Sequence, residues 1–140
     1  MAPRSEATSE ERRMMELARF ARLATVSPAG EPHVVPVCPL LDGDTVVVAS
    51  EENVKVGYLR ANPRAALVFD DSPEDWNRIV MVMVQGSVEV VTSEDPRWFV
   101  WREAFYAKFP QYEPLAALDE TSLMLVLSIQ RIRGYDPGAE

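Results

Sequence analysis

Residues 22–50, RLATVSPAGEPHVVPVCPLLDGDTVVVAS, decide the fold because they contain three β-type runs joined by turn residues. The runs are Arg22–Val26, His33–Leu41 and Thr45–Ser50. Ser-Pro-Ala-Gly at 27–30 and Asp-Gly-Asp at 42–44 separate them, and the glycine in each turn can adopt the positive φ that a tight reversal requires. Valine-rich runs between such turns predict antiparallel strands that follow one another in the chain.

The chain on either side of this stretch divides into elements of the same kind. A helix is expected over about residues 9–21, because Thr8 and Glu11 have capping-box spacing ahead of an apolar stripe. Further expected elements are a short helix over about 54–61 that Asn62-Pro63 ends, a strand Ala65–Phe69, an acidic loop Asp70–Arg78, one bent strand or a strand pair over Ile79–Val91 with a bulge at Gly86, a helix Glu94–Phe109, and a last strand Ser122–Ile132 that ends before a turn at 134–137. Six or seven closely spaced strands predict a mainly β protein, an antiparallel barrel with flanking helices in a single domain of residues 1–140.

Several of the expected strands lack strict alternation of apolar and polar residues. Val34-Val35, Val46–Val48 and Met81–Val84 are apolar at successive positions. Strands of this kind are covered on both faces. The helices can cover part of the sheet, and we expect a second copy of the chain to cover the rest, which predicts a homodimer. Trp98 and Trp101 are expected to pack in the core or at that dimer contact.

Composition and charge exclude several classes of function. The chain has 140 residues, of which 47% are hydrophobic, and a formal net charge of −8. Such a surface repels phosphate backbones and anionic membranes, so neither nucleic acid nor a membrane is expected as a partner. One histidine and one cysteine are too few for a structural zinc site. The N-terminus lacks the apolar segment of a signal peptide and one cysteine cannot form an internal disulfide, so a cytoplasmic location is expected.

The segment 51–64, EENVKVGYLRANPR, places a lysine in the first turn of the expected short helix. Asn53 is the expected N-cap, and the start of a helix carries a partial positive charge. Free amides beside an ammonium group form a phosphate site, so Lys55 is a candidate phosphate ligand. The alternative is a solvated lysine on a connecting helix, and the negative charges of Glu51 and Glu52 favour that alternative.

An ordered set of motifs resembles a known family. FARLATVSPAGEPHVVPV, LDGDTVVVAS, a lysine shortly before Asn-Pro-Arg, VQGSVEVV and LSIQRIRGYDP follow one another over roughly residues 17–136. Together they are similar to the pyridoxamine 5'-phosphate oxidase-like split barrels. The resemblance implies a six-stranded antiparallel split β-barrel of the FMN-binding type, a homodimer, and a flavin or deazaflavin in a groove at the subunit interface. The segment Asp75–Arg78 is most similar to the branch of this family that is associated with the deazaflavin coenzyme F420.

The resemblance also implies which residues hold the cofactor. Lys55 matches the family lysine that binds the cofactor phosphate, and the backbone of the strand that begins at His33 runs along the edge of the ring. The candidate cofactor-binding residues are Lys55, Asn53, Val54, Ser50, Ala49, His33, Val34, Val35, Pro36 and Met81. Catalytic residues are not identified, and no metal ligand is expected.

Three positions depart from the pattern of the oxidase itself. Asn53 and Val54 stand where many relatives have serine and arginine, so one bidentate phosphate partner is missing. Met81 stands where the oxidase has a polar contact to the ring. These departures argue against oxidation of pyridoxamine phosphate by this chain.

Two functions remain open at this point. The first is a flavin- or deazaflavin-dependent oxidoreductase that moves a hydride between FMN or F420 and a small organic substrate, with the ring supplying the chemistry. The family branch favours F420, whereas the shortage of basic residues for its acidic tail favours FMN. The second is a non-catalytic module that carries or senses flavin or haem, which the absence of a recognisable acid, base or nucleophile set favours. His33 as a proton donor and Cys38 as a redox group are weaker candidates, because histidine and cysteine are common as structural residues in strands.

Overall fold

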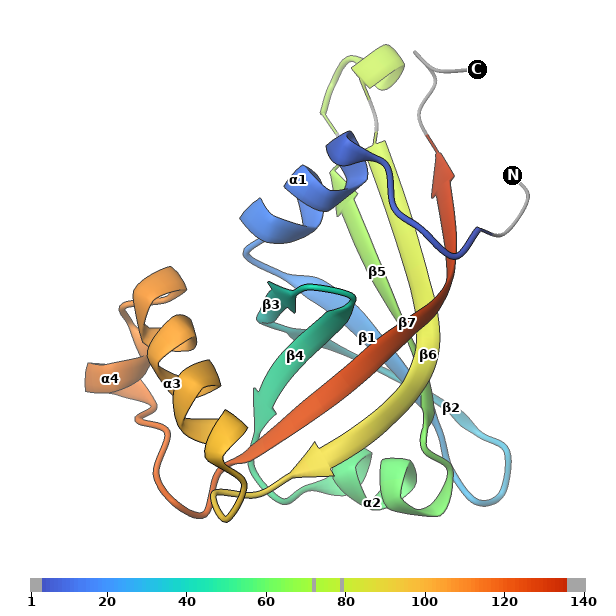
Figure 1. The fold of residues 1–140 in the computed structure, drawn as a ribbon. Coiled ribbons are helices and arrows are strands. Elements are labelled where there is room, and N and C mark those ends of the chain that lie inside the picture. Colours follow the sequence, from blue (N-terminus) through green and yellow to red (C-terminus); the bar gives the residue numbers. More distant parts are fainter. Residues whose placement is uncertain (1–3, 72, 79, 136–140) are drawn as a thin grey trace.

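The structure is a computed structural model that describes residues 4–71, 73–78 and 80–135. Its elements are α1 (Ser9–Leu17), β1 (Ala21–Val26), β2 (Pro32–Val37), β3 (Pro39–Asp42), β4 (Thr45–Ser50), α2 (Val54–Ala61), β5 (Arg64–Asp71), η1 (Trp76–Arg78), β6 (Val80–Val91), α3 (Pro96–Lys108), α4 (Tyr112–Leu115) and β7 (Leu123–Tyr135). Figure 1 shows a curled sheet with helices along one side and α2 at one end, which confirms the mainly β class. Within these ranges, none of the helices has the length and apolar character needed to cross a membrane.

The seven strands form one antiparallel sheet in the order β2-β1-β5-β6-β7-β4-β3. The first and last strands of this order, β2 and β3, are neighbours in the chain and are separated by Cys38 alone. The predicted single strand His33–Leu41 therefore bends at Cys38, pairing with β1 before the bend and with β4 after it. The bend closes the sheet into a split barrel and explains why seven strands occur where the family resemblance implies six. Pro36 and Pro39 flank the bend, and neither can donate a backbone hydrogen bond to a strand ladder.

Local signals in the sequence predict the turns and one cap correctly. The capping box formed by Thr8 and Glu11 is present at the start of α1. Gly30 and Gly43 adopt φ values of 85° and 58°, as the two hairpin turns require. The register of β6 against β7 shifts at Gly86, which confirms the predicted bulge, and a Cβ at this position would overlap the backbone of β7.

The predicted end of the first helix is wrong. α1 ends at Leu17, and not at residue 21. Ala21 is instead the first residue of β1, where it is fully buried and pairs with Val37. Tertiary pairing therefore outweighs the apolar pattern that continued the helix in the sequence.

The last two strands are longer or more continuous than predicted. β6 is one strand rather than a pair, and its predicted first residue, Ile79, lies outside the described residues. β7 continues past Ile132 to Tyr135. Asp136 and Pro137 of the predicted terminal turn also lie outside the described residues.

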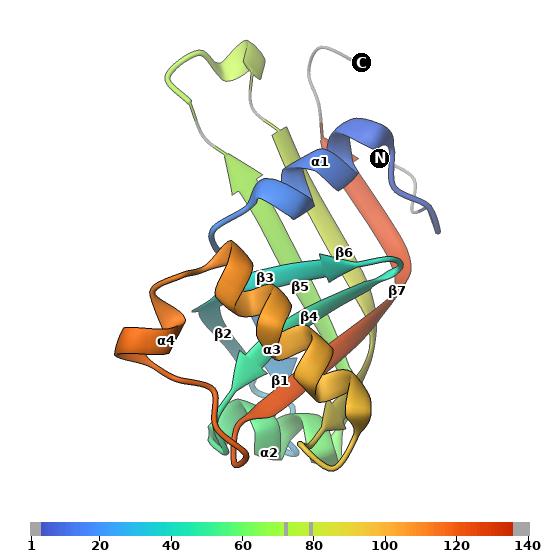
Figure 2. The ribbon, with the colours of Figure 1, turned by 60° about the vertical axis from the view of Figure 1, so that its left-hand side comes forward.

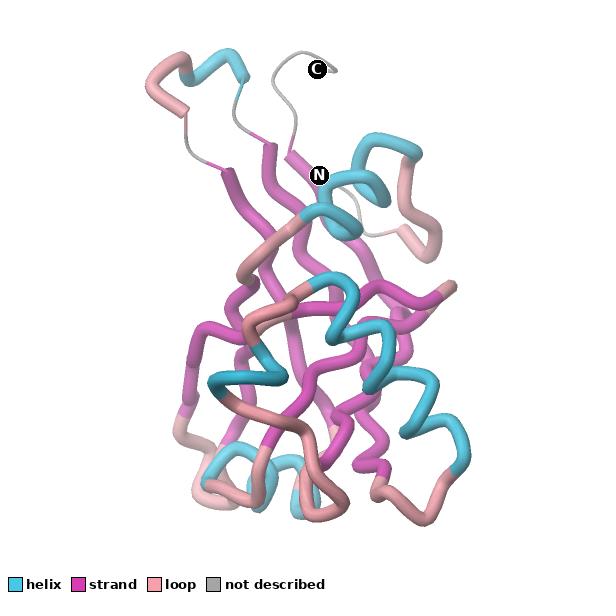
Figure 3. Tube along the Cα trace, turned by 90° about the vertical axis from the view of Figure 1, so that its left-hand side faces the viewer, coloured by secondary structure: helices cyan, strands magenta, loops and turns pink. Residues whose placement is uncertain are grey.

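The apolar side chains form two clusters, one on each face of β4 and β7. The first fills the barrel, and α2 contributes Val56 and Leu59 to it. The second lies between β3, β4, β7 and α3, and Figures 2 and 3 show α3 lying across these strands. Trp98 and Trp101 are only 1% and 6% exposed within the second cluster, so they belong to the core and not to an outer dimer contact.

The opposite side of the molecule is less covered. The cluster under α3 includes residues of β3, β4, the first half of β7 and the end of β6, and none of its described residues comes from the outer face of β1, β2, β5 or the first half of β6. Val34 on this face is 60% exposed, and Met81 and Met83 are half-buried. The sheet therefore presents apolar side chains that its own helices do not cover.

Candidate functional site

The start of α2 lies where β4 ends and the chain turns into a short helix. Asn53 occupies the predicted N-cap position, but its side chain accepts no capping hydrogen bond. Its Nδ2 donates instead to Ser50 Oγ over 3.4 Å. Ser50 is buried and donates its hydroxyl proton to the Glu51 carbonyl oxygen over 2.7 Å. The first-turn amides of α2, beginning with the exposed Val54, therefore lack a side-chain cap.

Lys55 lies half-buried in this first turn. Burial lowers the pKa of its ammonium group, and the nearby Glu51 carboxylate acts in the opposite direction. Glu52 is paired with Arg60 of α2, which partly neutralises its charge. A partly desolvated ammonium group interacts more strongly with an anion than a fully hydrated one does. Lys55 and the uncapped amides are thus suited to hold a phosphate.

The His33 ring connects β2 to α2. It packs edge-on against Tyr58, with ring centroids 5.6 Å apart and an interplanar angle of 89°. Tyr58 follows Lys55 by one helical turn, and residues with this spacing lie on the same side of a helix. The contact therefore brings Lys55 and β2 to the same end of the barrel.

Two buried polar atoms at this end have no hydrogen-bond partner among the described residues, namely Thr25 Oγ1 and His33 Nδ1. Thr25 and His33 face each other across β1 and β2. Buried polar atoms are nearly always hydrogen-bonded, so this pair indicates a place where water or a ligand completes the bonding. Thr25 and Tyr58 were missed in the sequence, although pairing the strands on either side of the turn at 27–30 could have placed Thr25 opposite His33.

The strand β2 has a free edge. It is the first strand in the sheet order, so one side of its backbone has no strand neighbour among the described residues. Alternate residues of an antiparallel strand direct their N–H and C=O groups away from the paired neighbour. Val34 and Pro36 are exposed, and His33 and Val35 are half-buried. The edge can therefore offer backbone hydrogen bonds to a flat ring despite the apolar side chains.

The remaining predicted cofactor residues divide into two groups. Ala49 is half-buried beside Ser50 at the end of β4, close in the chain to α2. Met81 pairs with Asp70 and Tyr135 at the far end of β5, β6 and β7. Figure 1 shows that this end lies opposite α2. One copy of the chain therefore does not bring Met81 together with Lys55.

A cavity of about 310 Å³ opens beside Thr25. Arg64 of β5 and Arg131 of β7 line it, together with Asn62 and Gln85. Two arginines in one cavity are notable in a chain with a net charge of −8. Because a guanidinium group binds carboxylates and phosphates through paired hydrogen bonds, this cavity can receive an anionic group.

A comparison with family sequence models gives the class of this protein. The model described as Pyridoxamine 5'-phosphate oxidase matches residues 7–135, which is nearly the whole chain. The chain therefore belongs to the pyridoxamine 5'-phosphate oxidase family. No curated protein is significantly similar to it in sequence.

Solved structures share the fold at low sequence identity. An FAD-binding protein from Mesorhizobium loti has a TM-score of 0.76 and 20% identity, with 96% of this chain and 97% of that chain covered. HutZ, the haem storage protein from Vibrio cholerae, has a TM-score of 0.74 and 16% identity, with 89% and 91% covered. An F420 reductase has a TM-score of 0.68 and 21% identity, with 91% and 98% covered. These likenesses confirm the predicted split-barrel fold.

Proposed function

We propose that this chain binds FMN or coenzyme F420 and is an oxidoreductase that transfers a hydride between that cofactor and a small organic substrate. The observation that carries the proposal is the half-buried Lys55 at the uncapped start of α2, in a chain of this family. The cofactor ring would supply the redox chemistry. The chain would bind the cofactor, orient it and limit the access of water.

The groups around α2 have distinct parts in this proposal. Lys55 and the first-turn amides of α2 bind the phosphate. The free edge of β2, from His33 to Pro36, offers backbone groups to the ring. The unpartnered Thr25 Oγ1 and His33 Nδ1 lie at the same end of the barrel and support a polar ligand there.

The proposal includes a homodimer. The outer sheet face exposes Val34 and carries the half-buried Met81 and Met83, and a second copy of the chain is the natural cover for it. Met81 can contact a cofactor held by Lys55 only if it comes from the other copy. A stable interface of this kind buries upwards of ~2,000 Å². Sedimentation at micromolar concentration tests it, and a single species of 15.7 kDa would contradict it.

The choice between FMN and F420 depends on the basic groups near the site. The acidic tail of F420 requires cations, which the sequence alone did not locate. The cavity with Arg64 and Arg131 supplies two of them beside Thr25. The arginine pair therefore favours F420, while FMN needs only the phosphate site at Lys55.

A non-catalytic carrier of flavin or haem is the second candidate function. It is favoured by the sequence, in which no acid, base and nucleophile set is recognisable. Haem requires an axial ligand, and His33 is the sole histidine of the chain. With His33 as the axial ligand, His33→Ala should weaken haem binding in this alternative, whereas flavin binding through the backbone of β2 should largely remain.

The decisive experiment is the visible absorption spectrum of the purified protein, followed by titration with FMN, F420 and haemin. Saturable binding of FMN or F420, with hydride transfer to or from a panel of small substrates, supports the oxidoreductase. Binding of haemin that depends on His33, without binding of FMN or F420, supports the carrier. If none of the three binds, both candidate functions are wrong.

A further inference from the structure

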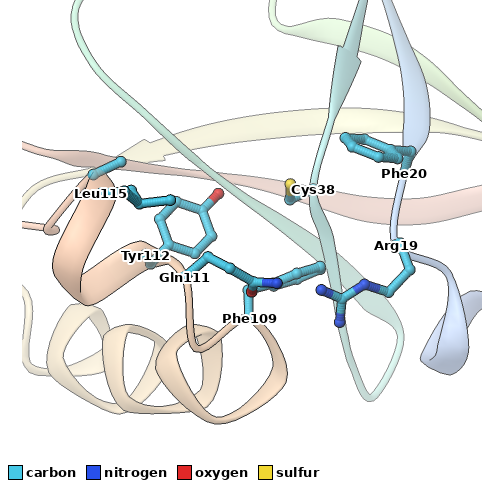
Figure 4. A pocket seen from close by; sticks show the side chains of 8 residues that line it. Arg19, Phe20, Cys38, Phe109, Gln111, Tyr112 and Leu115 are labelled. Atoms are coloured by element: carbon cyan, nitrogen blue, oxygen red, sulfur yellow. The ribbon is translucent and has the colours of Figure 1, made fainter.

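A second cavity, of about 420 Å³, lies where α4 meets the bend between β2 and β3. Figure 4 shows its side chains converging from three parts of the chain, namely the segment before β1, the bend itself, and the end of α3 with α4. The lining residues are Arg19, Phe20, Cys38, Phe109, Gln111, Tyr112, Leu115 and Ala116. The volume falls within the range of small-molecule sites, on the order of 300–1,000 Å³.

The walls of this cavity are mainly apolar and aromatic. Phe109 is almost fully buried, whereas Phe20 and Leu115 are 60% and 81% exposed. Large apolar side chains that surround a cavity and remain exposed favour a ligand with an apolar body, because the ligand removes them from water. The aromatic rings of Phe20, Phe109 and Tyr112 favour a flat body.

Arg19 gives the cavity a positive end. It is the one charged side chain among the described lining residues, and no carboxylate lines the cavity. Its guanidinium carbon lies 4.7 Å from the centroid of the Phe109 ring, and its Nη1 donates to the Lys108 carbonyl oxygen over 2.9 Å. These contacts orient the guanidinium group of the exposed Arg19, and its other N–H donors have no partner within the described part of the chain. A guanidinium group with free donors is suited to a carboxylate or sulfonate.

A second cation, Lys108 at the end of α3, lies near Arg19. Lys108 Nζ donates to the Pro39 carbonyl oxygen over 2.7 Å. Burial, together with repulsion from Arg19, lowers the pKa of Lys108 to about 8, while Cys38 and Glu16 act in the opposite direction. The two cations therefore repel each other, and an anion bound at Arg19 would reduce that repulsion.

We propose that this cavity binds a small organic anion with a flat apolar body, of the class of the aromatic carboxylates. The apolar body would lie among Phe20, Phe109 and Leu115. The acid group would accept hydrogen bonds from Arg19, with the Gln111 amide as a second donor. The proposal does not require a cofactor at α2.

Calorimetric titration of the full chain with 2-naphthoate and with the neutral 2-naphthamide tests the proposal. The parent protein should bind naphthoate about fivefold or more tightly than naphthamide, because only the acid gains a charge-assisted hydrogen bond. Arg19→Gln should remove this preference and leave the affinity for naphthamide within about twofold. Arg13→Gln removes the same charge from an exposed position on α1 and should keep the preference.

A second pair of variants locates the binding site. Ala116→Trp places an indole in the cavity and should weaken both ligands by about tenfold or more. Ala117→Trp changes the exposed neighbour that does not line the cavity, and it should leave both affinities unchanged. Absence of naphthoate binding, equal affinities for the two ligands, or a preference that survives Arg19→Gln would overturn the proposal. A preference that is lost in Lys55→Ala and kept in Arg19→Gln would also overturn it, because the anion would then bind at α2.

Discussion

The helices α2 and α3 both follow a strand, but their N-termini are built differently. At α3 the Asp95 side chain accepts a hydrogen bond from the Arg97 amide over 2.9 Å, and the Arg97 side chain pairs with Asp95 and Glu89. At α2 the Asn53 side chain accepts no such bond, and Lys55 lies half-buried in the first turn. A carboxylate at a helix N-terminus is favourable and a cation there is unfavourable, because of the helix dipole.

This difference separates a helix end that stabilises the fold from one that is suited to binding. At the start of α3 the Asp95 side chain caps the helix, and Trp98 anchors the helix by packing in the core and by a hydrogen bond to the Ser122 carbonyl oxygen. The start of α2 has free amides and a partly desolvated ammonium group, which an anion would complete. Substitutions at the start of α3 should therefore lower the stability of the fold, whereas substitutions at the start of α2 should weaken ligand binding and leave the stability nearly unchanged.

The largest effect on stability is expected for Trp98→Ala in α3. Trp98 is 1% exposed, and its indole N–H donates to the Ser122 carbonyl oxygen over 3.0 Å. The substitution should lower the free energy of unfolding by ~3–5 kcal/mol, because it leaves a cavity and an unpaired acceptor. Denaturant unfolding measures it, with Phe99→Ala on the 47%-exposed neighbour as the control that should change far less. An equal loss of unfolding free energy in the two variants would show that Trp98 does not anchor α3 to the sheet.

A smaller effect distinguishes the two caps directly. Asp95→Ala removes the side chain that caps α3 and should lower the melting temperature by roughly 2–6 °C. Asn53→Ala removes no capping bond and should change it by less than about 1 °C. Thermal unfolding of both variants beside the parent protein is the measurement. A larger loss for Asn53→Ala would mean that the Asn53 side chain does stabilise the start of α2.

The smallest effect concerns Lys108 at the end of α3. Burial lowers its pKa from 10.5 to about 8 in the fold, so the unfolded chain binds more protons between these two pH values. Stability from this group is therefore highest above pH 10.5 and is lost as the pH falls through 8. The parent protein should gain stability from pH 8 to 9.5 relative to Lys108→Met, a comparison that cancels the contributions of Lys55 and Tyr112. Parallel stability curves for the two proteins would contradict the assignment.

The features that the sequence predicted well are those with a local cause. The capping box of Thr8 and Glu11, the turns at Gly30 and Gly43, and the bulge at Gly86 each depend on a few adjacent residues. The bend at Cys38 was missed because the residues before Cys38 and those after it are similarly apolar, so the run from His33 to Leu41 resembles one strand. Its two halves differ only in the strand with which each half pairs.

The candidate site was only partly predictable for the same reason. Lys55 and its place in the first turn of a helix follow from neighbouring residues. The contact between His33 and Tyr58, and the unpartnered Thr25, depend on elements that meet only in the folded chain. The partial burial of Lys55 likewise reflects packing that a sequence does not display.

The role of Lys55 as the phosphate ligand is tested most directly by the affinity of Lys55→Ala for FMN and for F420 at fixed ionic strength. Loss of a charge-assisted contact to phosphate should weaken binding by ~1.5–3 kcal/mol, or roughly 10- to 150-fold in Kd, without a change in the unfolding temperature larger than a few degrees. Arg60→Ala, on the same helix but paired with Glu52, is the matched control and should bind like the parent protein. If Lys55→Ala binds both cofactors as tightly as the parent protein does, the start of α2 is not the phosphate site and the account is wrong.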